Sequence, residues 1–145
     1  MARPIRVIQW ATGSMGKTCL RAVIDSPDCE LVGLFVYSPA KVGADAGDIA
    51  RRPSTGVFAT NDIEAILALD ADVVLHCPML AAPYDGHDGD VKRLLESGKN
   101  VISINNYFNP RALGDAYAAG LEASALKGRA ALAGDNDRAH ELYGQ

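Results

Sequence analysis

A turn rich in small residues lies near the amino terminus, and its residue types and spacing suit phosphate binding. The turn reads ATGSMG over residues 11–16 and follows a short β-favouring segment from Ile5 to Trp10. A dinucleotide-binding turn needs glycine where the backbone turns tightly, where it approaches the pyrophosphate and where the helix packs on the strand. Gly13 and Gly16 fill the last two positions and Ala11 fills the first, so the motif is a degenerate A-x-G-x-x-G. Its position between a predicted strand and a predicted helix favours a ligand-binding turn over a purely structural one.

The same residues also fit a second phosphate-binding motif. With Lys17 and Thr18 they form a Walker A loop in which alanine replaces the first glycine. Lys17 would then contact the β- and γ-phosphates, and Thr18 would hold Mg²⁺. Such a site also needs an acidic residue at the end of a neighbouring strand, and the predicted strands end in HCP, YS and NN instead. We therefore favour the dinucleotide turn and keep the P-loop as the alternative.

Alternating patterns predict the elements that would position this turn. Apolar residues from Met15 to Ile24 recur at helical spacing, and the run ELVGLFVY over residues 30–37 predicts a strand that is covered on both faces. Three further strands and three further helices are predicted. The strands are Gly56–Thr60, Ala71–Cys77 and Val101–Ile104; the helices follow Asn61 as N-cap, contain Val91, Leu94 and Leu95 before Gly98, and follow Asn109 as N-cap.

This alternation predicts a single α/β domain with a Rossmann-like, doubly wound parallel sheet of strand order 3-2-1-4-5. The third strand would lie at the edge. The ligand crevice would lie between the carboxyl ends of the first and fourth strands, so that Gly13 and Pro78 face the same ligand. We expect a nucleotide-binding domain over residues 1–126 and an irregular tail over residues 127–145, in which no strand is recognisable.

The end of the second predicted strand bears on the choice of cofactor. An NAD-selective site usually carries Asp or Glu there, whereas an NADP site offers neutral and basic groups to the 2′-phosphate. Here the residues are YSPAK over 37–41, and the next carboxylate is Asp45. Ser38 as a donor and Lys41 as a counter-charge favour NADP(H), with NAD(H) as the other choice. The alternative for Lys41 is a solvated side chain.

Composition limits the other classes of function. The 145 residues suit one domain, and the net charge of −4 argues against general nucleic-acid binding. No apolar run approaches the roughly 20 residues that a membrane-spanning helix needs, so we expect no membrane partner. Cys19, Cys29 and Cys77 suit neither a disulfide framework nor a metal site. We expect no metal. The amino terminus MARP leads straight into a strand-like run without the pattern of a secretory signal, so we expect a cytoplasmic location.

Two other sets of residues could carry chemistry. His76 and Cys77 are neighbours on a predicted strand, so their side chains point to opposite faces and cannot bind one metal together. Core packing is favoured for His76; a general-base role near the nicotinamide is the alternative, and no other catalytic residue is assigned. Arg51 and Arg52 could clamp a phosphate or a substrate carboxylate, but a solvated loop pair is favoured.

The stretch from Arg6 to about Leu121 resembles the N-terminal NAD(P)-binding domain of dihydrodipicolinate-reductase-like proteins, especially the 2,4-diaminopentanoate dehydrogenase branch. The segments that carry the resemblance are RVIQWATGSMGKTCLRAVI, ELVGLFVYSPAKVGADAG, TGVFATNDIEAILALDADVVLHCP and KNVISIN. The resemblance implies an oxidoreductase that reduces a cyclic imine or oxidises an amino-acid-like substrate with NAD(P)(H). It also implies roles for residues of the turn and of two strand ends. Gly13, Ser14, Met15 and Gly16 would bind the pyrophosphate, Ser38 and Lys41 would bind the adenosine ribose end, and Cys77, Pro78 and Met79 would lie on the nicotinamide side. Ala11 and Thr12, which begin the same turn, are also expected to bind the cofactor.

Proteins of this family continue into a second α/β domain, which supplies the substrate pocket and most oligomer contacts. We expect that domain to be absent from this chain, and truncation is the favoured explanation. A component of a split enzyme and a stand-alone, non-catalytic NAD(P)-binding module are the alternatives. A homo-oligomer or a partner domain would cover the edge of the sheet near the C-terminal strand.

Overall fold

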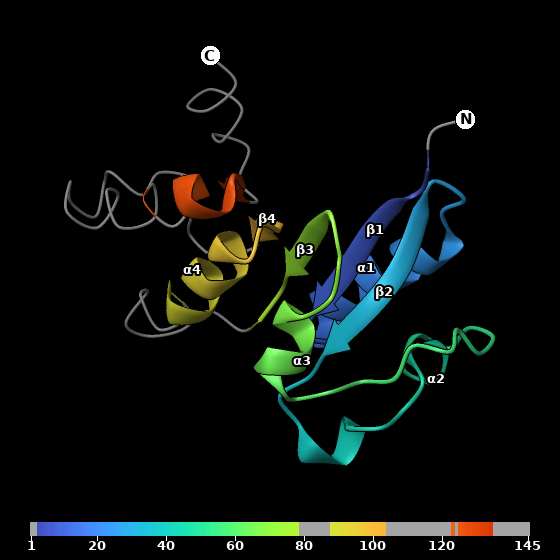
Figure 1. The fold of residues 1–145 in the computed structure, drawn as a ribbon. Coiled ribbons are helices and arrows are strands. Elements are labelled where there is room, and N and C mark those ends of the chain that lie inside the picture. Colours follow the sequence, from blue (N-terminus) through green and yellow to red (C-terminus); the bar gives the residue numbers. More distant parts are fainter. Residues whose placement is uncertain (1–2, 79–87, 104–122, 124, 135–145) are drawn as a thin grey trace. The chain divides into compact units, whose positions relative to one another are not determined.

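The computed structural model describes residues 3–78, 88–103, 123 and 125–134 (Figure 1). The chain divides into two compact units, Met1–Pro78 and Met79–Gln145. In chain order the first unit contains β1 (Ile5–Trp10), α1 (Ser14–Asp25), β2 (Cys29–Phe35), the 3-10 helix η1 (Pro39–Lys41), α2 (Ala46–Ala50), α3 (Ile63–Leu67) and β3 (Val73–His76). The second unit contains α4 (Asp88–Glu96), β4 (Asn100–Ser103) and β5 (Leu132–Gly134).

In the first unit β1 lies between β2 and β3, and both neighbours run parallel to it (Figure 1). Trp10, the last residue of β1, is in register with Phe35 of β2 and with His76 of β3, so the three strands end at the same edge. Parallel neighbours need crossover connections, and α1 makes the one from β1 to β2. The predicted Rossmann-like α/β class is confirmed, and so is the position of the first strand between the second and the fourth of the predicted order.

Helices cover both faces of this sheet. On one face, side chains of α1, α2 and β2 form a cluster in which Leu20 and Leu34 are fully buried. On the other face, Ile66 of α3 and the following Leu69 lie close to Gly33 of β2. Burial of each large aliphatic side chain contributes about 1.5–3 kcal/mol, so these two layers stabilise the sheet that carries the turn.

The predicted third strand, Gly56–Thr60, is wrong: the segment forms only isolated bridges, Thr60 with Phe35 and Phe58 with Asp45. The reason lies in Asp45, whose carboxylate accepts hydrogen bonds from the backbone N–H groups of Thr55 and Gly56. Those contacts fold the beginning of the segment toward α2. Only Thr60 reaches the edge of β2, where its N–H donates to Leu34 and its carbonyl accepts from Val36.

The cap of α3 also differs from the prediction by one residue. Asp62, not Asn61, is the N-cap, and its side chain accepts a hydrogen bond from the backbone N–H of Glu64 at 3.0 Å. The Thr60 side chain accepts a hydrogen bond from the N–H of Asp62. Thr60 still forms the bridge to Phe35 of β2, so the helix begins one residue later than the predicted cap at Asn61 indicated.

In the second unit β4 and β5 are parallel, with Val101 in register with Leu132. The predicted apolar face of α4 is confirmed, since Val91, Leu94 and Leu95 are fully buried, and Gly98 follows the helix with a φ of +91°. β5 lies in the tail for which no strand was recognised, because three residues are too few to show a period. Ile104 and the helix predicted after Asn109 lie outside the described residues. No helix in the described part of the chain is long and apolar enough to span a bilayer.

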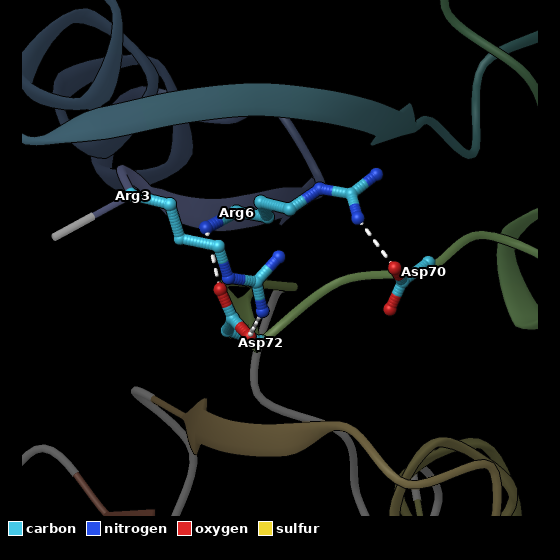
Figure 2. Close-up of polar contacts among 4 residues, drawn as sticks. All are labelled: Arg3, Arg6, Asp70 and Asp72. Carbon is cyan, nitrogen blue, oxygen red and sulfur yellow. Dashed lines mark hydrogen bonds and ion pairs between the residues drawn. The ribbon is translucent and has the colours of Figure 1, made fainter.

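Charged residues tie the beginning of β1 to the segment before β3 (Figure 2). Asp72 accepts hydrogen bonds from the Arg3 guanidinium and from the backbone N–H of Arg6, each at 2.9 Å. The Arg6 guanidinium pairs with Asp70. These contacts hold the amino end of β1, the end opposite the glycine turn.

Candidate functional site

The glycine turn lies where β1 ends, at the carboxyl edge of the first unit's sheet. Ala11 follows β1 directly and adopts a φ of +79°, a left-handed conformation that residues with a Cβ rarely adopt. Its N–H donates to the carbonyl of Phe35 in β2 at 2.8 Å. Gly13 is the N-cap of α1, with a φ of −67° and a ψ of −169°. The first position of the motif therefore does require the conformation that glycine adopts most easily, although alanine occupies it.

The two glycines of the turn are required for different reasons. A Cβ on Gly16 would collide with the carbonyl group of Ala11, so glycine is needed there for α1 to pack on the turn. A Cβ on Gly13 would meet nothing within 4 Å, and its φ is ordinary for any residue. Packing within the described structure therefore explains why residue 16 must be glycine, but it does not explain why residue 13 is glycine. A group that approaches the backbone from outside would explain Gly13.

Backbone N–H groups at the beginning of α1 are available to such a group. Gly13 has no side chain to cap the helix, and the first turn contains no acidic residue. The N–H groups of Ser14, Met15 and Gly16 have no acceptor among the residues that the structure describes, whereas that of Lys17 bonds to the Gly13 carbonyl. Unpaired N–H groups together with the positive end of the helix dipole make an anion site.

This geometry does not support the Walker A alternative. A P-loop wraps the phosphates with a loop that continues to its lysine, but here Ser14, Met15 and Gly16 are already helical. The Thr18 hydroxyl donates to the Ser14 carbonyl at 3.0 Å, a bond within the helix. Asp45, the next acidic residue after β2, is buried, and its carboxylate is taken up by hydrogen bonds within its own loop.

Lys41 extends from η1 to the turn. Its ammonium group donates to the Thr12 hydroxyl at 2.9 Å and to the Thr12 carbonyl at 3.3 Å. The side chain thus adds a positive charge beside the N–H groups of α1, rather than standing free in solvent. Ser38 is the exposed N-cap of η1. The structure brings Lys41 and Thr12 together although 29 residues separate them.

Three aromatic residues at the ends of β1 and β2 form part of the same edge, and the sequence analysis missed them. Trp10 is fully buried and stacks on Phe35, with ring centroids 3.8 Å apart. Its indole N–H donates to the Tyr37 hydroxyl at 2.8 Å, while Tyr37 is half exposed. The available signal was the occurrence of aromatic residues just before the turn and just after the second strand.

At the same carboxyl edge of the sheet, the end of β3 lies on the side of β1 opposite β2. Cys77 is buried; its N–H donates to the Trp10 carbonyl, and its sulfur lies 3.9 Å from that of Cys19 in α1. His76 is fully buried, with its ring centroid 6.0 Å from that of Trp10, so it packs in the core. Its role as a general base stays a prediction. Pro78 ends the first unit, and Met79 lies outside the described residues.

The arginine pair after α2 does not contact the turn. Arg52 forms a bidentate ion pair with Asp25 at the end of α1, with both N–O distances 2.8 Å. Hydrogen bonding to Arg52 lowers the pKa of Asp25, and the same contact raises the pKa of Arg52. Arg51 is the left-handed C-cap of α2. For Arg52, both sequence interpretations are replaced by an ion pair that ties the loop to α1.

Comparison with known proteins shows which family this chain belongs to. A family model described as dihydrodipicolinate reductase, N-terminus, matches residues 7–80. An amine dehydrogenase of Streptomyces virginiae is 37% identical over 100 residues, which cover 68% of this chain and 28% of that protein. A 4-hydroxy-tetrahydrodipicolinate reductase of Synechococcus elongatus is 39% identical over 70 residues, which cover 48% of this chain and 26% of that protein. The matches thus span little more than a quarter of the length of these relatives.

Solved structures share the fold. An amine dehydrogenase from Mycobacterium smegmatis superposes with a TM-score of 0.82 at 22% identity, over 92% of this chain and 40% of the other. A biliverdin reductase from Synechocystis sp. PCC 6803, in complex with biliverdin and NADP+, gives 0.66 at 22% identity, over 90% and 37%. GenD2 from gentamicin A biosynthesis, in complex with NAD, gives 0.67 at 22% identity, over 92% and 35%.

Proposed function

We propose that this chain, which belongs to the family of dihydrodipicolinate reductase N-terminal domains, binds a nicotinamide dinucleotide with its diphosphate at the beginning of α1. Ala11, Thr12, Gly13, Ser14, Met15 and Gly16 would form the diphosphate site. The observation that carries the proposal is the turn itself. The space outside Gly13 is open, and the N–H groups of the next three residues lack an acceptor within the described structure. A diphosphate would meet both conditions, because it accepts several hydrogen bonds and approaches the backbone closely.

We further propose that the cofactor is NADP(H), although related folds hold either NADP+ or NAD. Ser38 and Lys41 would bind the adenosine ribose end, and the position of the Lys41 ammonium beside Thr12 supports a role in charge neutralisation. Cys77, Pro78 and Met79 would lie on the nicotinamide side. The buried Cys77 would contribute its backbone there, since its thiol faces Cys19.

In the whole protein the dinucleotide would exchange a hydride with a cyclic imine or an amino-acid-like substrate. Relatives named amine dehydrogenase and 4-hydroxy-tetrahydrodipicolinate reductase support this proposal. A non-catalytic NAD(P)-binding module is the second candidate, and it keeps the same turn. The nucleotide-binding domain over residues 1–126, its cytoplasmic location and a homo-oligomer or partner domain at the sheet edge stay predictions.

Calorimetric titration of the purified chain with NADPH, NADH and ATP, each with and without Mg²⁺, tests the proposal. We expect NADPH to bind without Mg²⁺ and ATP not to bind in the same range. Mg²⁺-dependent ATP binding without dinucleotide binding would contradict the proposal. Added imines and NADPH then separate an enzyme from a binding module, because only an enzyme oxidises the cofactor.

The cofactor preference has its own pair of variants. Lys41→Ala should weaken NADPH binding about tenfold and NADH binding less, because a lost charge-assisted contact to phosphate costs about 1.5 kcal/mol. Lys17→Ala is the matched control, since that lysine lies within α1 and a P-loop would depend on it. Equal losses of affinity for NADPH and NADH in Lys41→Ala would indicate that Lys41 contacts the diphosphate and not the 2′-phosphate.

A further inference from the structure

Gln9 is a fully buried polar residue inside β1, an unusual place for an amide side chain. It is in register with Leu34 of β2 and Leu75 of β3. A Cβ on Gly16 would lie 3.5 Å from the Gln9 side-chain nitrogen, so the amide lies beneath the first turn of α1. Gln9 therefore occupies the space between the strand, the glycine turn and the helix.

The Gln9 amide makes a single hydrogen bond within the described structure. Its Nε2 donates to the carbonyl oxygen of Ala11 at 3.0 Å, while its Oε1 has no partner among the described residues. Because a carbonyl oxygen only accepts, the contact fixes which end of the amide faces Ala11. A buried acceptor without a partner is unfavourable, and an apolar side chain would fill the same space without that cost. What distinguishes Gln9 from such a side chain is its bond to Ala11.

The carbonyl that Gln9 holds is the centre of the strained part of the turn. Ala11 has a positive φ of +79°, and its carbonyl group is the one that excludes a Cβ from Gly16. Left-handed backbone is unfavourable for a residue with a Cβ, so surrounding contacts must hold it. The Gln9 hydrogen bond is a side-chain contact that does so from below the turn.

We propose that Gln9 is a positioning residue for dinucleotide binding: it holds Ala11 in the left-handed conformation and so directs the N–H groups of Ser14, Met15 and Gly16 at the diphosphate. This inference rests on the proposed function. It adds a residue that touches no ligand and acts through the backbone of the turn. If Gln9 acts in this way, its importance must fall when residue 11 adopts a positive φ without help, as glycine does.

The test uses four variants of the full chain: Gln9→Met, Ala11→Gly, the double variant, and Val74→Ala as a control. Methionine keeps the length of the side chain and cannot donate a hydrogen bond. Val74 is fully buried in β3, so its truncation lowers stability without touching the turn. NADPH affinity is measured by titration at a temperature at which all variants are folded.

We expect Gln9→Met to weaken NADPH binding about fivefold to tenfold, as loss of one net hydrogen bond allows. Val74→Ala should stay within about twofold of the parent chain, since it removes no polar contact. In the Ala11→Gly background the same Gln9→Met change should weaken NADPH binding by less than about twofold relative to Ala11→Gly itself, because a positive φ is not costly for glycine.

Three results would overturn the inference: unchanged binding by Gln9→Met, an equal loss in Val74→Ala, or the same loss from Gln9→Met in the Ala11→Gly background. Amide spectra of the ligand-free proteins give a readout that needs no cofactor. The cross-peaks of residues 11–16 should shift in Gln9→Met and stay in place in Val74→Ala. If the parent chain binds no dinucleotide, the proposed function fails, and unchanged spectra for Gln9→Met would then reject the role of Gln9 separately.

Discussion

Two turns of the first unit present backbone N–H groups, and they differ in where the acceptor comes from. Before α2, the Asp45 carboxylate accepts five hydrogen bonds, three of them from the backbone N–H groups of Gly47, Thr55 and Gly56. The other two come from the hydroxyls of Ser54 and Thr55. Before α1, the equivalent N-cap is Gly13, which has no side chain to offer.

The difference separates a turn that is complete by itself from the turn that we propose to bind a ligand. In the loop from Asp45 to Gly56 the chain supplies its own anion, and the loop is complete without a ligand. In the turn from Ala11 to Gly16 the donors lack an acceptor within the described structure, and the backbone strain at Ala11 is kept. Strain and unpaired donors at one place are typical of sites that a ligand completes.

The largest loss of stability is expected from Gly16→Ala. Alanine is the better helix former by about 1 kcal/mol, yet its Cβ would collide with the Ala11 carbonyl. We expect a net destabilisation of about 1–3 kcal/mol in chemical denaturation, with loss of dinucleotide binding. Gly13→Ala is the matched control, and it should change stability by less than about 1 kcal/mol because the space there is open. An equal loss of stability in both variants would contradict the claim that only Gly16 is required for packing.

Asp45→Asn should have the next largest effect, because an amide cannot accept all five hydrogen bonds. We expect Tm to fall by about 5–10 °C, while dinucleotide affinity measured on the folded protein changes little. Hydrogen bonds from the Thr55 and Gly47 N–H groups and from Ser54 hold the pKa of Asp45 well below its ordinary value of 3.8, against the opposing effect of burial.

The pH dependence of Asp45 follows from the direction of that shift. A depressed pKa in the folded state gives stability that is fully present above pH 3.8 and is lost as the pH falls below it. The free energy of unfolding, measured by chemical denaturation, should therefore fall more steeply below about pH 4 in the parent chain than in Asp45→Asn. Parallel acid curves for the two proteins would show that Asp45 does not stabilise the loop as an anion.

The smallest effect is expected at the amino end of β1, where the charges pair in contact with solvent (Figure 2). The Arg3 side chain is 63% exposed, so its ion pair with Asp72 is screened. Arg3→Ala should change the free energy of unfolding by less than about 0.5 kcal/mol and leave dinucleotide binding unaltered. A larger effect on binding would show that this end of the strand is coupled to the turn.

Local sequence patterns predicted the turn, whereas contacts between residues far apart in the sequence could not be predicted. The strand, the turn and α1 follow from neighbouring residues, so the position of Gly13 and Gly16 between a strand and a helix could be predicted from spacing alone. The bond from Lys41 to Thr12 joins residues far apart in the sequence, and only the path of the chain after β2 creates it. Gln9 did give a signal, as a polar residue inside an apolar run, but its partner could not be inferred.

The wrong third strand has a similar cause. Gly56–Thr60 has the composition of a strand, but the Asp45 carboxylate accepts a hydrogen bond from its first N–H group, that of Gly56. Tertiary hydrogen bonds of this kind override β-propensity, which is a weak and context-dependent preference. The Asn61 cap was wrong by one position because Asn61 and Asp62 are adjacent residues with similar capping ability.

The most direct test of the central claim gives the turn before α1 an anion of its own, as the turn before α2 already has. Gly13→Asp places a carboxylate at the N-cap of α1, where the backbone is extended and the space for a side chain is open. Thermal denaturation and NADPH titration are then measured on the same sample. We expect stability to rise by about 0.5–1 kcal/mol from helix capping, and NADPH affinity to fall at least about a hundredfold because the carboxylate occupies the diphosphate site. Unchanged NADPH binding by Gly13→Asp would contradict the claim that the beginning of α1 receives the diphosphate.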